Sequence, residues 1–449
     1  MYPRELHAIR GPGVPKCHTL QPLRTPSYPL SNRSERLLSF PVPTALPDHP
    51  DPDRAALAAF GSGHRAFVVR FNPAAPLSRA MTLYDRVADL PVSIDSIDFE
   101  RHEMDTSAGF TRVSTVVELH GADDADGSNA AGSAGAVGRG EDVTYETADQ
   151  EALLAAHTDG TLDWDLTGEF TLDSFSAHLD DQDLFPEPPE QETFRHYRRW
   201  AVESAALDLA LRQADTDFAA ALGRSYDPVE FVVSTRLDTG DAPSADRVEK
   251  WLAVDPTLAF KLDPTPAWSD DLLDALAATD SVRILDFKAY YEGTDVDQAP
   301  DPDLYRRVAA AFPEAILEDA KITDETRDAL AGTEARLSWD YPVTGVESVR
   351  ELPVDPEWLN IKPSRFGTVE SLLATVEYCL EAGITMYGGG QYELDVGRQH
   401  LHALASTFYP DSPNDVAPRA YNVPEPHADV PASPLDPPAD PAGLGWQFR

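Results

Sequence analysis

The sequence predicts an α/β protein in which a parallel β/α barrel follows a smaller α+β domain. First, its 449 residues are 42% hydrophobic, enough for one large barrel or two to three ordinary domains. Second, short apolar segments that end in polar residues recur every 22–32 residues in the second half of the chain, as β/α units do. Third, the first of these segments lacks the glycine-rich turn that is usual in an open, doubly wound sheet. The predicted strand ends are Arg236, Lys261, Asp286, Glu318, Asp340, Lys362 and Tyr387.

The negative charge of the chain excludes several classes of function. The 77 acidic and 36 basic residues give a formal net charge of −41. Such a surface repels phosphate backbones and anionic lipids, so we expect no nucleic-acid partner and no membrane partner. No apolar run approaches the roughly 18 residues that a membrane helix needs, and two cysteines are too few for a disulfide framework. We expect a cytoplasmic protein.

Lysine is scarce for so charged a chain. Only six of the 36 basic residues are lysine. An excess of carboxylates with little lysine is typical of proteins adapted to concentrated salt, where screening weakens the repulsion between like charges. The composition therefore predicts a halophilic protein.

The first 80 residues differ from the rest of the chain. Residues 1–80 contain 10 basic and 5 acidic residues and 13 of the 39 prolines. They lack the sustained apolar core of a secretory signal. We expect this segment to be disordered, or to be upstream sequence added by a misassigned start.

Residues 81–190 have the pattern of a small α+β domain. Strands are predicted at 92–101 and 111–120, the second of which is rich in β-branched residues. A third strand is predicted at 141–146, followed by a helix. Residues 121–140 are mostly Gly, Ala, Ser and Asp, so we expect a flexible insert between the second and third strands.

The barrel is predicted to span residues 191–410. It opens with a helix over 192–214, whose periodicity places Trp200 and Leu207 on one face. The last segment, 411–449, is rich in proline, which excludes a helix or a central strand. We expect this segment to pack on the barrel or on the small domain.

The candidate site lies at the carboxyl ends of the barrel strands, which meet at one face. Three predicted strands end in Asp286, Glu318 and Asp340. Converging carboxylates repel one another, so we expect a hard divalent cation, Mg²⁺ or Mn²⁺, to hold them together. One acidic residue at a strand end is commonly only a helix cap. However, three of the six lysines also fall at strand ends, among them Lys261 and Lys362, which favours a functional site.

Four segments carry a resemblance to a known family. They are the helix WAVESAALDLAL (200–211), the strand VEFVVST (229–235), the segment NIKPSRFG (360–367) and the segment GGGQYE (388–393). In order and spacing they resemble the enolase superfamily, and most closely its muconate-lactonizing branch, over residues 92–410. The resemblance implies a modified TIM barrel, (β/α)7β, with an N-terminal α+β capping domain. The implied metal ligands are Asp286, Glu318 and Asp340, and the implied acid/base groups are Lys261 and Lys362.

The reaction that this resemblance implies is removal of a proton α to a carboxylate. The product is an enediolate, whose charge the bound cation would neutralise. With lysines on both faces of the substrate, one abstracts the proton and the other redelivers it, which gives racemisation or epimerisation. Loss of a β-substituent gives cycloisomerisation or dehydration instead. The expected partner is a small carboxylate substrate, the expected lid is the loop at 103–110, and barrels of this family commonly form homo-oligomers.

Two positions depart from the family pattern. Lys288 stands where an asparagine is usual, two residues after Asp286. Its ammonium group either binds a substrate carboxylate or replaces the metal electrostatically, and both interpretations remain open. On the second strand, the register places either Lys261 or Asp263 at the catalytic position.

Further candidates for substrate binding follow the sixth and seventh strands. Arg365 has the charge to pair with a substrate anion, although a simple ion pair is the plainer interpretation. The glycine run 388–390 exposes backbone N–H groups, which makes Gly389 and the following Glu393 candidates, whereas the plain alternative is a tight turn.

Two other functions remain open at this stage. A lysine desolvated inside the barrel, Lys261 or Lys362, is a possible nucleophile for a Schiff-base enzyme of the aldolase type. The presence of Lys288 is also consistent with a non-catalytic, metal-free barrel.

Overall fold

The computed structural model describes residues 81–121, 135–237, 242–294 and 296–446. These residues all lie in one compact unit, Leu77–Arg449. The predicted N-terminal extension, 1–80, lies outside the described residues, as does most of the predicted insert. No helix in the described part of the chain is long and apolar enough to cross a membrane.

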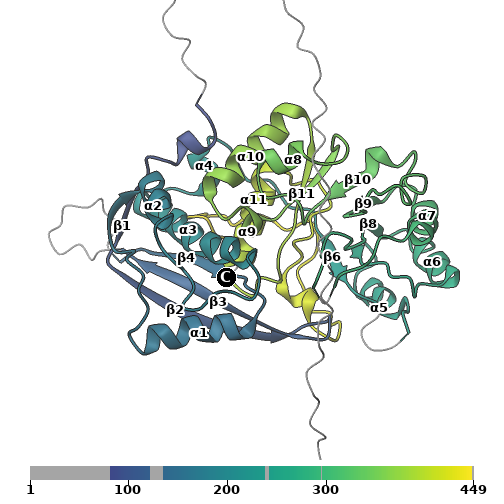
Figure 1. Cartoon of the computed structure of the whole chain (residues 1–449), viewed down its shortest axis with the longest axis horizontal. Helices are drawn as coiled ribbons and strands as arrows, with labels where there is room; N and C mark the ends of the chain where they lie inside the picture. The colour runs from purple at the N-terminus through teal and green to yellow at the C-terminus, as the bar shows by residue number, and fades with distance from the viewer. Residues whose placement is uncertain (1–80, 122–134, 238–241, 295, 447–449) are drawn as a thin grey trace, which may run out of the picture. The chain divides into compact units, whose positions relative to one another are not determined.

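The capping domain is built on a three-stranded antiparallel sheet. Its central strand, β3 (Thr111–His120), matches the predicted second strand and pairs with β2 (Ser96–Asp105) and β4 (Val137–Asp142). Figure 1 shows this sheet between helices α1 (Thr147–Thr158) and α3 (Phe194–Gln213). Because both helices contact β3, six successive residues of this strand are buried.

A smaller sheet joins the start of this domain to its end. The predicted first strand is interrupted at Asp95, and its first part is a separate strand, β1 (Pro91–Ile94). β1 pairs with β5 (Gly168–Thr171), which leads directly into helix α2 (Leu172–Leu179). A short 3-10 helix, η1 (Tyr84–Arg86), precedes β1.

The start of β4 corrects the sequence prediction. The flexible insert was expected to reach residue 140 and the strand to span 141–146, but β4 already begins at Val137. The composition around Gly138 and Gly140 indicates a loop, yet both glycines lie on β4 and allow helix α3 to pack closely against it. A Cβ at either position would lie within 2.1 Å of a backbone carbonyl oxygen of α3. Only glycine allows the helix to lie so near the strand.

Seven parallel strands form the barrel wall, in the order in which they occur along the chain. Ile284 and Ile316 belong to a small apolar cluster inside the barrel. Asp286 and Glu318 lie two residues further along the same strands, so their side chains share the inward face. The strands are β6 (Val232–Thr235), β7 (Ala259–Leu262), β8 (Val282–Asp286), β9 (Ile316–Glu318), β10 (Leu337–Trp339), β11 (Trp358–Ile361) and β12 (Thr385–Gly388).

One of the predicted β/α units lacks its helix. The connection from β9 to β10 contains only turns and a short 3-10 helix, η2 (Glu334–Arg336). There the Thr326 hydroxyl donates to the Lys321 carbonyl and accepts from the Thr323 backbone N–H, so this side chain competes with helical hydrogen bonds. The remaining helices are α4 (Phe218–Ala221), α5 (Asp246–Val254), α6 (Asp270–Ala277), α7 (Pro302–Ala311), α8 (Val346–Arg350), α9 (Pro363–Phe366), α10 (Val369–Ala382) and α11 (Val396–Phe408).

The barrel is closed between β6 and β12 by Asn414 and Asp415, which lie after residue 410, the predicted end of the barrel. The Val232 N–H donates to the Asn414 carbonyl at 2.8 Å, and the Asp415 N–H donates to the Gly388 carbonyl at 2.8 Å. Asn414 and Asp415 therefore occupy the position of an eighth strand. The barrel thus includes the start of the proline-rich segment.

The rest of the C-terminal segment runs along both domains. Its backbone pairs with the barrel between Val229 and Leu435. It reaches the cap at the tip of the β2–β3 hairpin, where the Ser107 N–H donates to the Asn422 carbonyl at 2.7 Å. Asn422 ends the short 3-10 helix η3 (Arg419–Asn422).

Candidate active site

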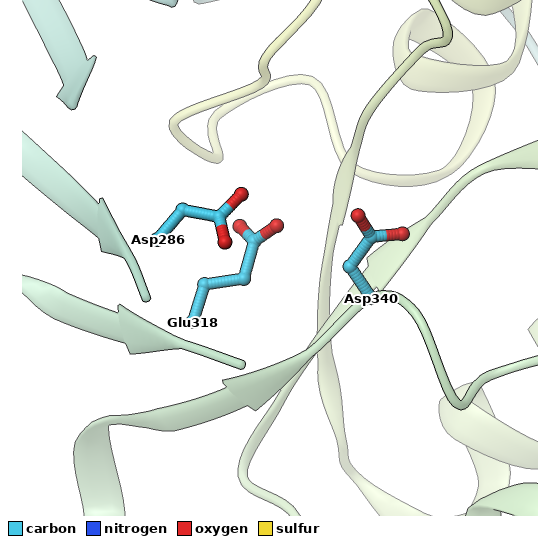
Figure 2. Close-up of side chains that lie close together, drawn as sticks. All are labelled: Asp286, Glu318 and Asp340. Atoms are coloured by element: carbon cyan, nitrogen blue, oxygen red, sulfur yellow. The ribbon is translucent and has the colours of Figure 1, made fainter. Parts of the chain in front are cut away.

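Three carboxylates meet at the carboxyl ends of neighbouring barrel strands. Asp286 and Glu318 are the last residues of β8 and β9, and Asp340 directly follows β10. All three are fully buried, and each offers an oxygen within 4.8 Å of the others. Figure 2 shows the three side chains next to one another at the strand ends. The structure therefore brings together the three residues that the sequence predicts as metal ligands, and we call them the acidic triad.

Lys261 reaches the triad from β7. Its Nζ lies 2.6 Å from Glu318 Oε1, 3.1 Å from Asp286 Oδ2 and 3.2 Å from Asp415 Oδ2. Burial opposes its charge, but the three carboxylates outweigh burial and raise the pKa of Lys261 well above its ordinary value. As it stands in the structure, Lys261 is an ammonium group. Of the two residues that the register left open, Lys261 and not Asp263 touches the triad.

Lys362 and Arg365 both contact Asp340. Lys362 Nζ lies 2.7 Å from Asp340 Oδ2, and Arg365 Nε lies 2.7 Å from Oδ1. The Tyr291 hydroxyl donates to Asp340 Oδ2 at 2.7 Å. Although burial opposes ionisation, Arg365 and Lys362 hold the pKa of Asp340 well below its usual range. Asp340 is therefore a carboxylate anion with donors on both oxygens, and Arg365 is buried on it.

Lys288 lies on the other side of the triad. Its Nζ contacts Asp286 Oδ2 directly and lies 3.7 Å from Asp263 Oδ1. Asp263 in turn lies 3.8 Å from Arg236 Nε, so it belongs to this outer ion-pair group. Despite burial, Lys288 and Lys261 keep the pKa of Asp286 well below its usual range. The structure thus places both lysines on one carboxylate oxygen.

Glu318 is the most protonatable member of the triad. Burial, together with Asp286 and Asp340, raises its pKa to about 7, against the opposing effect of Lys261. The Tyr387 hydroxyl donates to Glu318 Oε2 at 2.6 Å. Its other oxygen accepts from Lys261 and from an asparagine amide on β11.

The structure adds four groups that the sequence reasoning missed: Asp415, Tyr387, Asn360 and Tyr291. Asn360 had a detectable signal, since it lies two residues before Lys362 and so shares its strand face. Tyr387 had been identified only as a strand end. Asp415 had no signal, because it lies in a proline-rich segment with no strand pattern.

The two candidates after the seventh strand also have structural roles. The Gly389 N–H, expected to face a substrate, donates to the Ile361 carbonyl at 3.2 Å. A Cβ on Gly389 would lie 2.3 Å from an Asn360 side-chain atom, so this glycine allows close packing beside the site. Glu393 accepts from the Gln391 N–H at 2.8 Å and lies 3.5 Å from Arg398. Both are engaged within the protein, as in the tight-turn alternative, and their role in substrate binding stays a prediction.

The tip of the β2–β3 hairpin contacts the loop after β12. The ring of Phe110 packs edge-on against Tyr392, with 5.4 Å between ring centroids. Arg112 donates to the Tyr392 carbonyl and stacks on Tyr145, and the Tyr145 hydroxyl donates to Gln391. A cavity of about 600 Å³ lies beside this tip, with Arg236 in its lining. The hairpin tip thus borders this cavity and the loop after β12, although residues 103–105 belong to strand β2 and not to a loop; its role as a lid stays a prediction.

The donor set of the triad suits a divalent cation. Carboxylate oxygens are the ligands that Mg²⁺ and Mn²⁺ prefer, and the spacing allows one ion to contact all three residues. The same oxygens are also contacted by basic side chains of the protein. The triad therefore fits a cation by ligand type and spacing, within a network that already holds positive charge.

Three solved structures are similar to the chain over about four fifths of its length. A dipeptide epimerase from Methylococcus capsulatus, complexed with Mg ion, has 18% identity and a TM-score of 0.56, covering 80% of this chain and 100% of its own. A dipeptide epimerase from Enterococcus faecalis has 17% identity and a TM-score of 0.55, covering 79% and 100%. A muconate lactonizing enzyme from Pseudomonas fluorescens, complexed with muconolactone, has 19% identity and a TM-score of 0.54, covering 80% and 97%.

The chain therefore has the fold that dipeptide epimerases and muconate lactonizing enzymes share, that of the enolase superfamily, which confirms the predicted fold. At these identities the likeness shows the fold alone. Two family models match the sequence: residues 85–221 match the N-terminal domain, and residues 225–423 the C-terminal domain, of a domain of unknown function, DUF8230. The second match includes the segment that closes the barrel. No protein of curated function matches the sequence.

Proposed function

We propose that the protein is an enzyme that removes a proton α to the carboxylate of a small substrate, through an enediolate, with the help of a divalent cation. The observation that carries this proposal is the position of two lysines. Lys261 and Lys362 extend from β7 and from the end of β11 and contact different members of the acidic triad. Proteins with this fold include dipeptide epimerases and muconate lactonizing enzymes, and one of them is complexed with Mg ion. These neighbours support the proposal.

The two lysines are proposed to divide the proton transfers between them. Lys362 contacts one member of the triad and is the proposed base, whereas Lys261 contacts three carboxylates and is the proposed acid. A cation held by Asp286, Glu318 and Asp340 would stabilise the negative charge that develops on the substrate oxygens. This proton transfer can lead to racemisation or epimerisation, to cycloisomerisation or to dehydration.

A non-catalytic, metal-free barrel is the second candidate. The observation that favours it is the direct contact of Lys288 and Lys261 with Asp286, which supplies positive charge without an ion. Of the Schiff-base alternatives, the one at Lys261 has less support. The raised pKa of Lys261 keeps this amine protonated, and a protonated amine is not a nucleophile.

The test is exchange of the α-proton with solvent. The wild-type protein is incubated in D₂O with Mg²⁺ and a panel of small chiral carboxylates, dipeptides included, and deuterium incorporation is followed by NMR. We expect exchange with at least one substrate, and a loss of at least about 100-fold in Lys362→Ala and in Lys261→Ala. EDTA should abolish the exchange in the wild-type protein.

The matched control is Lys321→Ala. Lys321 pairs with exposed Glu292 at 2.5 Å, and within the described residues no ion pair joins it to the acidic triad, so its loss should leave exchange unchanged. Exchange that persists in Lys362→Ala contradicts the proposed base. A wild-type protein that exchanges no member of the panel, yet binds carboxylates, favours the non-catalytic barrel.

A further inference from the structure

Lys288 contacts both carboxylate oxygens of one member of the acidic triad, Asp286. Its backbone N–H donates to Asp286 Oδ1 at 3.2 Å, while its Nζ contacts Asp286 Oδ2. Lys261 Nζ lies 3.1 Å from the same Oδ2. Both oxygens of Asp286 therefore have donors from the protein, and one of them lies between two ammonium groups.

The backbone holds Lys288 in an unusual conformation to make these contacts. Its φ is +55°, in the left-handed region that long side chains rarely adopt. Such backbone strain is maintained only where surrounding contacts stabilise it. Here the ammonium group lies 3.7 Å from Asp263 Oδ1 and 5.1 Å from the centroid of the Tyr291 ring, which adds a cation–π contact.

Basic side chains already neutralise much of the triad's charge without a metal ion. Its three carboxylates are contacted by four basic side chains. A divalent cation on Asp286 would lie within a few ångströms of the Lys288 ammonium, in a buried site where water screens the repulsion poorly. The ion would be a third positive charge at Asp286 Oδ2, beside Lys288 and Lys261, and the added repulsion would weaken its binding. The basic side chains are Lys261, Lys288, Lys362 and Arg365.

We propose that Lys288 competes with the divalent cation for Asp286. Its ammonium group occupies the place on Asp286 Oδ2 that the ion needs, so the ion binds only when the Lys288 side chain moves away. Asp263 is the neighbouring carboxylate that receives the displaced ammonium. This inference rests on the part of the proposed function that places a cation on the triad. It adds that the chain binds the ion weakly because of the Lys288 ammonium group, which a single substitution removes.

The experiment is a calorimetric titration with Mn²⁺ and no substrate. Lys288→Met and Lys288→Ala remove the charge and offer no ligand atom. We expect both to bind Mn²⁺ at least about tenfold more tightly than the wild-type protein, because the repulsion is gone. Lys288→Arg keeps the charge and Lys321→Met removes a surface lysine, so both should bind as the wild type does.

The outcomes separate this proposal from the proposed function. Neutral variants that bind no more tightly than the wild type, or that do not bind at all, overturn the competition. Folding of each variant is checked by its thermal unfolding transition, and the smaller Ala side chain provides a second neutral variant. The exchange assay with wild-type protein and Mg²⁺ tests the proposed function alone, whereas the Mn²⁺ titration contains no substrate and tests Lys288 alone.

Discussion

His400 is a buried residue whose polar atoms are unsatisfied. It lies in the middle of α11, is 1% exposed, and neither ring nitrogen has a hydrogen-bond partner within the described part of the chain. Burial, with Arg212 and Arg139 nearby, lowers the pKa of His400 to about 3. The folded protein therefore keeps this imidazole neutral, at the cost of leaving its polar atoms without partners.

The unfolding free energy should fall as the pH falls from 6.5 towards 3. The pKa of His400 is lower in the folded state, so below pH 6.5 only the unfolded chain gains the proton. We expect His400→Leu to reduce this dependence of the unfolding free energy on pH. The contribution of His400 is at most about 5 kcal/mol between pH 6.5 and pH 3. Urea unfolding at pH 7 and pH 5 measures it. His120→Gln, at a partly exposed histidine on the cap, is the control, and an unchanged slope in His400→Leu contradicts the assignment.

The central residues of the site could be predicted from the sequence for a physical reason. Parallel strands bring their carboxyl ends to one face, so Asp286 and Glu318 could be placed from strand periodicity alone. The charged groups that contact these residues could not be predicted in this way. Whether Lys288 touches Asp286 depends on a left-handed backbone angle, and Asp415 reaches Lys261 only because a proline-rich segment closes the barrel. Neither leaves a periodic pattern in the sequence.

At the scale of elements, close packing explains where the sequence prediction of the cap was wrong. Gly140 lies on β4 beneath α3, and a Cβ there would lie 1.9 Å from the Ala201 carbonyl oxygen. From the sequence alone, a glycine that is needed for close packing cannot be distinguished from a glycine in a flexible loop. The pairing of Asn414 with β6 was equally hidden, since the strand-like stretch is too short to show alternation.

Gly140→Ala should therefore destabilise the protein by about 3 kcal/mol or more, because α3 must move away from the sheet to accommodate one methyl group. Gly445→Ala is the matched control, since its Cβ would meet only the flexible Gln399 side chain at 3.2 Å. Chemical denaturation of both variants measures the difference. Equal unfolding free energies for the two variants would show that α3 does not pack on β4 as closely as described.

At the scale of the whole molecule, half of the lysines lie where they neutralise buried carboxylates. Three of the six lysines contact the triad or its neighbours, while the formal net charge of the chain is −41. The buried ion pairs are shielded from salt by the protein around them, whereas the excess acidic residues repel one another across the surface. Salt should consequently act on the surface and not on the site.

Thermal stability should then rise with KCl at neutral pH. The Debye length falls from about 10 Å at 0.1 M to about 3 Å at 1 M, so most of the gain should come below 1 M. We expect the unfolding midpoint to rise by at least about 5 °C over this range. At pH 5, where protonation has begun to reduce the net charge, the rise should be smaller. A sucrose series separates screening from a general effect of excluded cosolutes, because sucrose does not screen charge. A midpoint that is insensitive to KCl, or that responds equally at both pH values, would mean that surface repulsion does not limit stability and that the predicted adaptation to salt is wrong.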